Sequence, residues 1–244
     1  MTGTLHGVGV GPGDPELLTL KALRLIREAD VIAYPRSDEA PSFARAIVAE
    51  HLGAQVEEPI VVPMRAERFP AERVYDEAAE RLGAHLLAGR SVVVLCEGDP
   101  FFYGSFMYLY ARMAHRWPVR VVPGVSSMMA AASAVGRPLA ARDDVLTVVP
   151  ATLPDEAIEA RLARCDAAAI IKLGRHLPRL RALLDRLGLV GETQYCERVG
   201  LPEQRLAALD DLEGGTAPYF SMLLVYRGAE GWVADLPDVA EARA

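Results

Sequence analysis

An apolar run meets a polar turn in the stretch Val92-Val93-Val94-Leu95-Cys96-Glu97-Gly98-Asp99-Pro100. Residues 92–96 are apolar without alternation, which predicts a strand covered on both faces, as in the middle of a parallel sheet. The four residues that follow have the composition of a turn. Because open α/β sheets bind ligands beyond the carboxyl ends of their strands, this turn is predicted to lie at a ligand site.

Short β-rich runs alternate with helical patterns around this stretch. We predict further strands of the same parallel sheet at residues 5–10, 31–34, 56–62 and 119–122. One intervening helix is predicted over residues 70–87. Another is predicted to open at Pro15 and to carry an apolar face made of Leu17, Leu20, Leu23, Leu25 and Ile26.

A second group of strand-like runs follows, at residues 145–149, 168–172, 194–198 and 221–226. A helical pattern that begins at Ser126 separates the two groups. We therefore predict an α/β protein of two domains, over residues 1–122 and residues 123–244.

The composition is that of a globular protein and argues against several other classes. The net charge of −7 argues against a nucleic-acid-binding protein, because such proteins concentrate basic residues to displace counterions from phosphates. The three cysteines lie far apart, so neither a disulfide framework nor a metal site is predicted. There is no secretory signal, and no apolar span approaches the about 18 residues of a membrane helix. We expect a cytoplasmic protein that does not enter a membrane.

A glycine-rich segment, Gly7-Val8-Gly9-Val10-Gly11-Pro12-Gly13-Asp14, covers the first predicted strand and the turn after it. No frame of it matches the dinucleotide-binding fingerprint or the Walker phosphate loop. Its alternate residues lack side chains, which allows another backbone or a flat ligand to approach closely. A turn between strand and helix with no ligand is the alternative.

Two further segments carry polar groups at strand ends. In residues 97–104, the carboxylates of Glu97 and Asp99 can accept hydrogen bonds from a ligand, and the aromatic rings can pack against a planar group or a sulfonium. A turn followed by core aromatics is the alternative. In the segment after residue 122, Ser126 is expected to be a helix N-cap, whereas Ser127 can also reach a ligand.

Together, in this order and spacing, these three segments resemble the tetrapyrrole methylase family. The resemblance also includes Leu18-Thr19-Leu20-Lys21-Ala22 and Lys172-Leu173-Gly174, and so extends over nearly the whole chain. Within the family, residues 34–35, 96–108 and 125–130 are most similar to the members that methylate carbon 20 of precorrin-2, giving precorrin-3A in cobalamin biosynthesis.

The resemblance implies a tetrapyrrole trough in the N-terminal domain, a mixed sheet in the C-terminal domain and an active site in the cleft between the two domains. It also implies a homodimer, S-adenosylmethionine as methyl donor and a tetrapyrrole as substrate. The residues that would bind the donor, carried over by position, are Pro12, Gly98, Asp99, Phe101, Phe102, Ser126, Ser127, Leu173, Val199, Gly200, Tyr219, Phe220 and Ser221.

Two further roles follow from this chemistry. A base must remove the proton displaced at the methylated carbon, and the candidates are Asp14, Glu97 and Tyr103. Cations must bind the peripheral carboxylates of the substrate, and the candidates are Arg36, Arg65 and Arg68, which are otherwise solvated surface residues. The alternatives are a cobalt-containing substrate, methylation at another corrin-ring carbon, and a module that binds S-adenosylmethionine without turnover.

Overall fold

The computed structural model describes residues 2–63, 69–212, 215–228, 232 and 236 of the chain. The chain divides into two compact units, Met1–Ser126 and Ser127–Ala244, each with its own sheet and hydrophobic core. The division lies after the boundary predicted at residue 122, because the loop that follows the last strand of the first sheet stays with the first unit. None of the described helices is long and apolar enough to cross a membrane.

The first unit is built on a five-stranded sheet in which neighbouring strands are parallel, as predicted. The strand order is β3-β2-β4-β1-β5. The strands are β1 (Leu5–Gly9), β2 (Val31–Ser37), β3 (Val56–Val62), β4 (Val92–Cys96) and β5 (Val119–Val122). Every residue of β4 is buried, which agrees with its unbroken apolar sequence and its place in the middle of the sheet.

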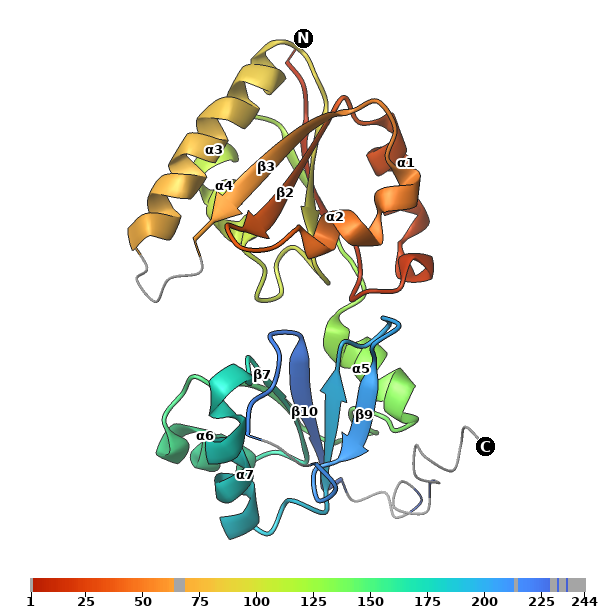
Figure 1. Ribbon diagram of the computed structural model, residues 1–244, viewed down its shortest axis with the longest axis vertical. Helices are drawn as coiled ribbons and strands as arrows, with labels where there is room; N and C mark the ends of the chain where they lie inside the picture. The colour runs from red at the N-terminus through yellow and green to blue at the C-terminus, as the bar shows by residue number, and fades with distance from the viewer. Residues whose placement is uncertain (1, 64–68, 213–214, 229–231, 233–235, 237–244) are drawn as a thin grey trace. The chain divides into compact units, whose positions relative to one another are not determined.

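Helices cover both faces of this sheet (Figure 1). α1 (Leu20–Glu28) and α2 (Phe43–Ile47) pack on one face, while α3 (Phe69–Leu87) and α4 (Phe106–Met113) pack on the other. The chain therefore leaves β1 toward the first face and leaves β4 toward the second, although β1 and β4 are neighbours. This reversal is the switch point at which open α/β sheets bind ligands.

The prediction for the first helix is wrong in its start, and of its predicted apolar face Ile26 is buried and Leu25 packs against the core, whereas Leu20 is exposed. Pro15–Leu17 forms only a 3-10 turn, and α1 begins after Thr19, whose Oγ1 accepts the Ala22 amide N–H at 3.1 Å. The side chains of Ala22 and Ile26 are buried, whereas Leu20 is 86% exposed. Because α1 begins at Leu20, after the Thr19 cap, residues 15–19 are not part of the helix and do not contribute to its buried face.

Three loops meet through their backbones at the carboxyl edge of the first sheet. The loops after β1 and β4 form an isolated bridge, in which the Gly98 N–H donates to the Gly11 carbonyl at 2.8 Å and the Gly11 N–H donates to the Gly98 carbonyl at 3.3 Å. A Cβ atom at Gly9 would lie 2.6 Å from the Cα of Gly124, in the loop after β5, and 2.6 Å from the Gly98 carbonyl oxygen. The close approach predicted for the glycine-rich segment is therefore that of neighbouring backbones.

Another glycine of β1 makes room for a side chain of α4. A Cβ atom at Gly7 would lie 2.3 Å from the ring of Phe106, which is only 2% exposed. Phe106 is the first residue of α4. The missing side chain at Gly7 thus lets the start of α4 pack directly on the strand.

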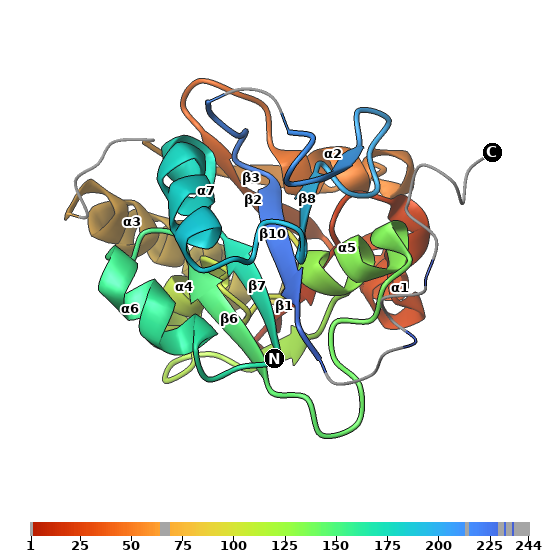
Figure 2. The same ribbon diagram turned by 90° about the horizontal axis from the view of Figure 1, so that it is seen from below.

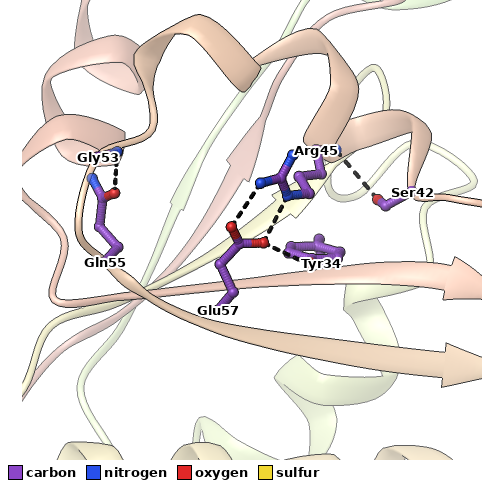
Figure 3. A network of polar contacts seen from close by, with 6 residues as sticks. All are labelled: Tyr34, Ser42, Arg45, Gly53, Gln55 and Glu57. Atoms are coloured by element: carbon purple, nitrogen blue, oxygen red, sulfur yellow. Dashed lines mark hydrogen bonds and ion pairs between the residues drawn. The ribbon is translucent and has the colours of Figure 1, made fainter.

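A polar network ties α2 to the strands β2 and β3 (Figure 3). The Arg45 guanidinium contacts both carboxylate oxygens of Glu57 at 2.7 Å, and the Tyr34 hydroxyl donates to the same carboxylate at 2.6 Å. The Ser42 Oγ accepts the Arg45 backbone N–H at 3.2 Å and so caps α2. These bonds, chiefly those from Arg45, lower the pKa of Glu57 to about 2. Their stabilising effect is therefore complete above the ordinary carboxyl pKa and is lost as the pH falls toward 2.

The second unit has a five-stranded mixed sheet of order β6-β7-β10-β8-β9. β6 and β7 are parallel, and the other neighbouring pairs are antiparallel. The strands are β6 (Leu146–Pro150), β7 (Ala167–Ile171), β8 (Thr193–Glu197), β9 (Arg205–Ala208) and β10 (Ser221–Tyr226). The sequence does not predict the edge strand β9, because its four residues include no β-branched or aromatic side chain.

Helices also cover this second sheet. α6 (Asp155–Leu162) and α7 (Leu177–Arg186) contribute side chains to the core on one face, and α5 (Ser127–Val135) contacts β8 and β10. Figure 2 shows α6 and α7 on one side of β10 and α5 on the other. The second unit is therefore layered like the first, with its core between sheet and helices.

Gly9→Ala should lower the free energy of unfolding by about 1–3 kcal/mol, because its methyl group cannot fit beside Gly98 and Gly124 without a backbone shift. Urea unfolding followed by circular dichroism measures the change. Gly53→Ala is the matched control in the same unit, since a Cβ atom there meets only the Gln55 Oε1, at 3.6 Å. Equal stability of the two variants would contradict the backbone contact between the loops.

Candidate active site

The switch point between β1 and β4 brings together the first-unit residues predicted to bind a ligand. Pro12 is buried in the loop after β1, and Gly98 lies in the loop after β4 with a φ of 61°. The loop after β5, which ends in Ser126, reaches the same edge of the sheet. The three segments singled out in the sequence therefore share one edge of one parallel sheet, where such folds bind ligands.

Both carboxylate oxygens of Asp99 are held by backbone amides of these loops. The Oδ1 atom accepts the Phe101 N–H at 2.9 Å, and the Oδ2 atom accepts the Gly124 N–H at 3.1 Å. The second bond crosses from the loop after β4 to the loop after β5. Because each carboxylate oxygen has two lone pairs, Asp99 can join the loops and still accept hydrogen bonds from a ligand in a defined direction.

The hydroxyl of Ser126 does not act as the helix cap that the sequence predicts. Ser126 directly precedes α5 and is only 7% exposed, yet its Oγ has no hydrogen-bond partner among the described residues. A buried hydroxyl without a partner is destabilising, and native structures seldom keep one unless a ligand or water completes it. Ser127 is the first residue of α5 and belongs to the second unit.

The aromatic residues after Asp99 lie outside the core. Phe101 is 48% exposed and Tyr103 is 45% exposed, so the alternative of core aromatics does not hold for these two. Phe101 contacts Tyr110 edge to face with ring centroids 5.0 Å apart, and Phe102 contacts Tyr103 in the same way at 5.1 Å. Tyr103 also has a φ of 56°, a conformation that non-glycine residues rarely adopt.

The three candidate bases have different surroundings. Burial raises the pKa of Glu97, and hydrogen bonding from its own amide and from the Ala44 amide offsets only part of that effect. The Oδ1 of Asp14 accepts the Glu16 N–H at 2.8 Å and so caps the turn after β1. The fold thus raises the proton affinity of Glu97.

The second-unit candidates gather at one edge of the second sheet. Leu173 and Val199 follow β7 and β8, and Ser221 begins β10, which runs antiparallel to both strands. Leu173 is 0% exposed and Val199 is 8% exposed, so both residues are buried. Gly200 has a φ of 82°, and Tyr219 is 69% exposed. The Ser221 hydroxyl donates to the Pro218 carbonyl at 2.7 Å.

Of the three arginines predicted to bind substrate, Arg36 lies near the end of β2, and its Nη1 donates to the Ser37 carbonyl at 3.4 Å. Arg65 and Arg68 lie outside the described residues. Within the described part of the chain, no group of three or more His, Cys, Asp or Glu side chains has an arrangement that would hold a metal ion.

Sequence reasoning does not single out Gly124 as a site residue, although its amide binds Asp99 and its backbone touches Gly9. The available signal is the glycine directly after Pro123, at the end of a strand predicted for the same sheet as the glycine-rich segment. That signal is weak, because a Pro-Gly pair is common in turns that bind nothing.

Comparisons with known proteins identify the family of the chain. The family model of the Tetrapyrrole (Corrin/Porphyrin) Methylases matches residues 4–212. The chain is 42% identical over 239 residues to the precorrin-2 C(20)-methyltransferase of a Sinorhizobium species, covering 94% of this chain and 96% of that protein. It is 45% identical over 235 residues to the cobalamin biosynthesis protein CobIJ of Mycobacterium tuberculosis, covering 93% of this chain and 46% of that protein. The chain thus spans about half the length of this mycobacterial relative.

A solved structure shows the same fold with a bound ligand. Uroporphyrin-III C-methyltransferase from Thermus thermophilus, in complex with S-adenosylhomocysteine, matches with a TM-score of 0.65 and 29% sequence identity, covering 91% of this chain and 97% of that one. Because the family model spans most of the chain and a relative of similar length is 42% identical, the chain belongs to the tetrapyrrole methylase family.

Proposed function

We propose that this protein is an S-adenosylmethionine-dependent C-methyltransferase that methylates carbon 20 of precorrin-2, giving precorrin-3A in cobalamin biosynthesis. The observation that carries this proposal is the 42% identity to the Sinorhizobium precorrin-2 C(20)-methyltransferase over 94% of this chain. A substrate that already contains cobalt, another ring carbon, and a binding module without turnover are the alternatives.

The described residues fit a sulfonium nucleoside at the carboxyl edge of the first sheet. The buried Ser126 hydroxyl has no partner among the described residues, the Asp99 carboxylate is oriented by two amides, and the ring of Phe101 is half exposed. Together they provide hydrogen-bonding groups and an aromatic face for a cationic sulfur. We assign contacts with the methyl donor to Pro12, Gly98, Asp99, Phe101, Phe102, Ser126, Ser127, Leu173, Val199, Gly200, Tyr219, Phe220 and Ser221.

The reaction requires mainly that the nucleophilic carbon of the substrate be aligned with the methyl group of the donor. When bound, S-adenosylmethionine supplies a methyl group on a positively charged sulfur, which an electron-rich carbon can attack. Orientation alone can contribute roughly 7–11 kcal/mol to such reactions in well-aligned systems. The backbone contact of Gly9 with Gly124 and the bonds made by Asp99 keep the three loops in fixed positions. Gly9 and Gly124 act by positioning the groups that touch the ligand, and Asp99 both positions the loops and contacts the donor.

Glu97 is our candidate for the base that accepts the proton lost from the methylated carbon. It directly follows β4 and precedes Gly98, so it lies at the switch point. Burial raises its pKa, which makes its carboxylate a stronger base than an exposed glutamate. Asp14 and Tyr103 are the other candidates at this edge.

The partners and the compartment are part of the proposal. We assign the peripheral carboxylates of the tetrapyrrole to Arg36, Arg65 and Arg68, and we propose that the protein acts as a homodimer, as the family resemblance implies. A reducing cytoplasm suits the three cysteines, all of which are buried and free. The net charge of −7 supports a protein that does not bind nucleic acid.

The product identifies the reaction. Purified protein incubated with precorrin-2 and S-adenosylmethionine should add one methyl group, and nuclear magnetic resonance should place it at carbon 20. A parallel incubation with cobalt-precorrin-2 tests the metal-containing substrate. A methyl group at another carbon contradicts the assigned position, and binding of both compounds without a methylated product favours the binding module.

Asp99→Asn should weaken the binding of S-adenosylhomocysteine roughly tenfold, because the amide group cannot accept both backbone N–H bonds and disturbs the loop. Isothermal titration calorimetry measures the affinity. Asp143→Asn, at an exposed position, is the control and should bind like the unaltered protein. Unchanged affinity in Asp99→Asn would remove this residue from the donor site.

Glu97→Gln should lower turnover roughly 10²–10⁴-fold while leaving the affinity for S-adenosylhomocysteine nearly unchanged, because it removes only a proton acceptor. In the unaltered protein, activity should fall as the pH drops through the raised pKa of Glu97, since the carboxylate is the active form. That acidic decline should be absent from the residual activity of Glu97→Gln. Glu50→Gln, at an exposed position, is the control. Equal turnover in both variants would rule Glu97 out as the base.

A further inference from the structure

Backbone strain marks particular loops of this protein. Among the described residues, the non-glycine residues with a left-handed backbone conformation are Tyr103, Arg142, Lys172 and Arg198. Such conformations are unfavourable for side chains with a Cβ atom and persist mainly where a functional group must be held in place. Two of them, Lys172 with a φ of 62° and Arg198 with a φ of 49°, directly follow strands of the second sheet.

The topology places these two residues at the same edge. β7 and β8 both run antiparallel to β10, which lies between them, so β7 and β8 point in the same direction. The register sets Ile171 of β7 and Cys196 of β8 opposite the same residue, Met222. Lys172 lies one residue beyond this common level and Arg198 lies two residues beyond it. Because β10 separates β7 from β8, the Cα atoms of the two residues are about 10 Å apart, which is twice the spacing between neighbouring strands.

Both residues carry a cationic side chain at a position whose left-handed backbone conformation glycine could adopt without strain. Lys172 is exposed, and the Arg198 side chain is 42% exposed. Among the residues that the structure describes, Arg198 pairs with the Glu197 Oε1 at the limiting distance of 4.0 Å, and the other oxygen of Glu197 accepts the Tyr195 hydroxyl at 2.7 Å. Packing and ion pairing thus explain little of why a strained cation stands at position 198.

We infer that Lys172 and Arg198 form a two-cation site that binds peripheral carboxylates of the tetrapyrrole substrate. The inference rests on the proposed function, because that function supplies a ligand with several carboxylates on flexible arms. Arg198 offers a planar fork for one carboxylate, and Lys172 offers a point charge for a second. Two sites about 10 Å apart suit two such arms of one macrocycle.

The test separates charge from backbone conformation. Lys172→Asn and Arg198→Asn remove the cations, yet asparagine tolerates the left-handed conformation better than other non-glycine residues. Lys172→Arg and Arg198→Lys keep the charge. Arg175→Gln removes a nearby exposed cation and is the matched control. Binding of uroporphyrin I, which has eight carboxylates, is followed by fluorescence, and binding of S-adenosylhomocysteine is measured by calorimetry.

Each asparagine variant should bind uroporphyrin I roughly tenfold more weakly, the size of one lost charge-assisted hydrogen bond. The double variant should lose more, and the charge-keeping variants and Arg175→Gln should stay within about threefold of the unaltered protein. Coproporphyrin I, with four carboxylates, should respond less to the asparagine substitutions. Melting temperatures of the asparagine variants should not fall, and S-adenosylhomocysteine affinity should not change.

Unchanged uroporphyrin binding in the asparagine variants, or none in the unaltered protein, would overturn the inference. A loss of S-adenosylhomocysteine affinity would also overturn it, because the two cations would then contribute to binding of the methyl donor. A lower melting temperature would overturn it as well, because the two side chains would then stabilise the folded protein. The methylation assay decides the proposed function separately. Charge-dependent porphyrin binding without methylation would support this site while contradicting the enzyme.

Discussion

Direct contact between backbones at the carboxyl edge of the first sheet is the constraint on which the candidate site depends. Gly9, Gly98 and Gly124 lie so close together that a Cβ atom at Gly9 or Gly124 would meet main-chain atoms of its neighbours. Main-chain atoms cannot move aside as the end of a long side chain can, so the three loops hold one another in position. The topology adds to this constraint, because the reversal between β1 and β4 places two of these loops at the switch point.

The polar groups on these loops divide into two kinds. Asp99 is satisfied by amides from two loops, so its carboxylate is oriented before any ligand arrives. The Ser126 hydroxyl is buried without a partner among the described residues. A bound ligand or a water molecule would supply the hydrogen bond that it lacks. A preorganised acceptor and an unsatisfied hydroxyl on two loops that are bonded to each other are expected of a binding site rather than of a plain turn.

Strain is distributed in a way that agrees with this picture. Of the described non-glycine residues with left-handed backbones, Tyr103 follows Asp99 in the first unit. Lys172 and Arg198 directly follow β7 and β8 in the second, and Arg142 lies between α5 and β6. For Tyr103, Lys172 and Arg198 the strain lies in a loop beyond the end of a strand, and the sheet supplies the rigid support that maintains it. Strands inside the two sheets, such as β4 and β7, are by contrast regular and largely buried.

The bounds of β3, β4, β5 and β10 could be predicted from the sequence alone, because each run is rich in β-branched or apolar residues and local composition of this kind favours a strand. The sequence also determined the family, through three loops in a characteristic order. The start of the first helix after Thr19 is also a local feature, since the cap is a bond to Ala22, three residues away. The sequence alone does not show that Ser126 makes no cap or that Leu173 and Val199 are buried in the core. These two features depend on contacts between residues far apart in the chain, which local patterns do not encode.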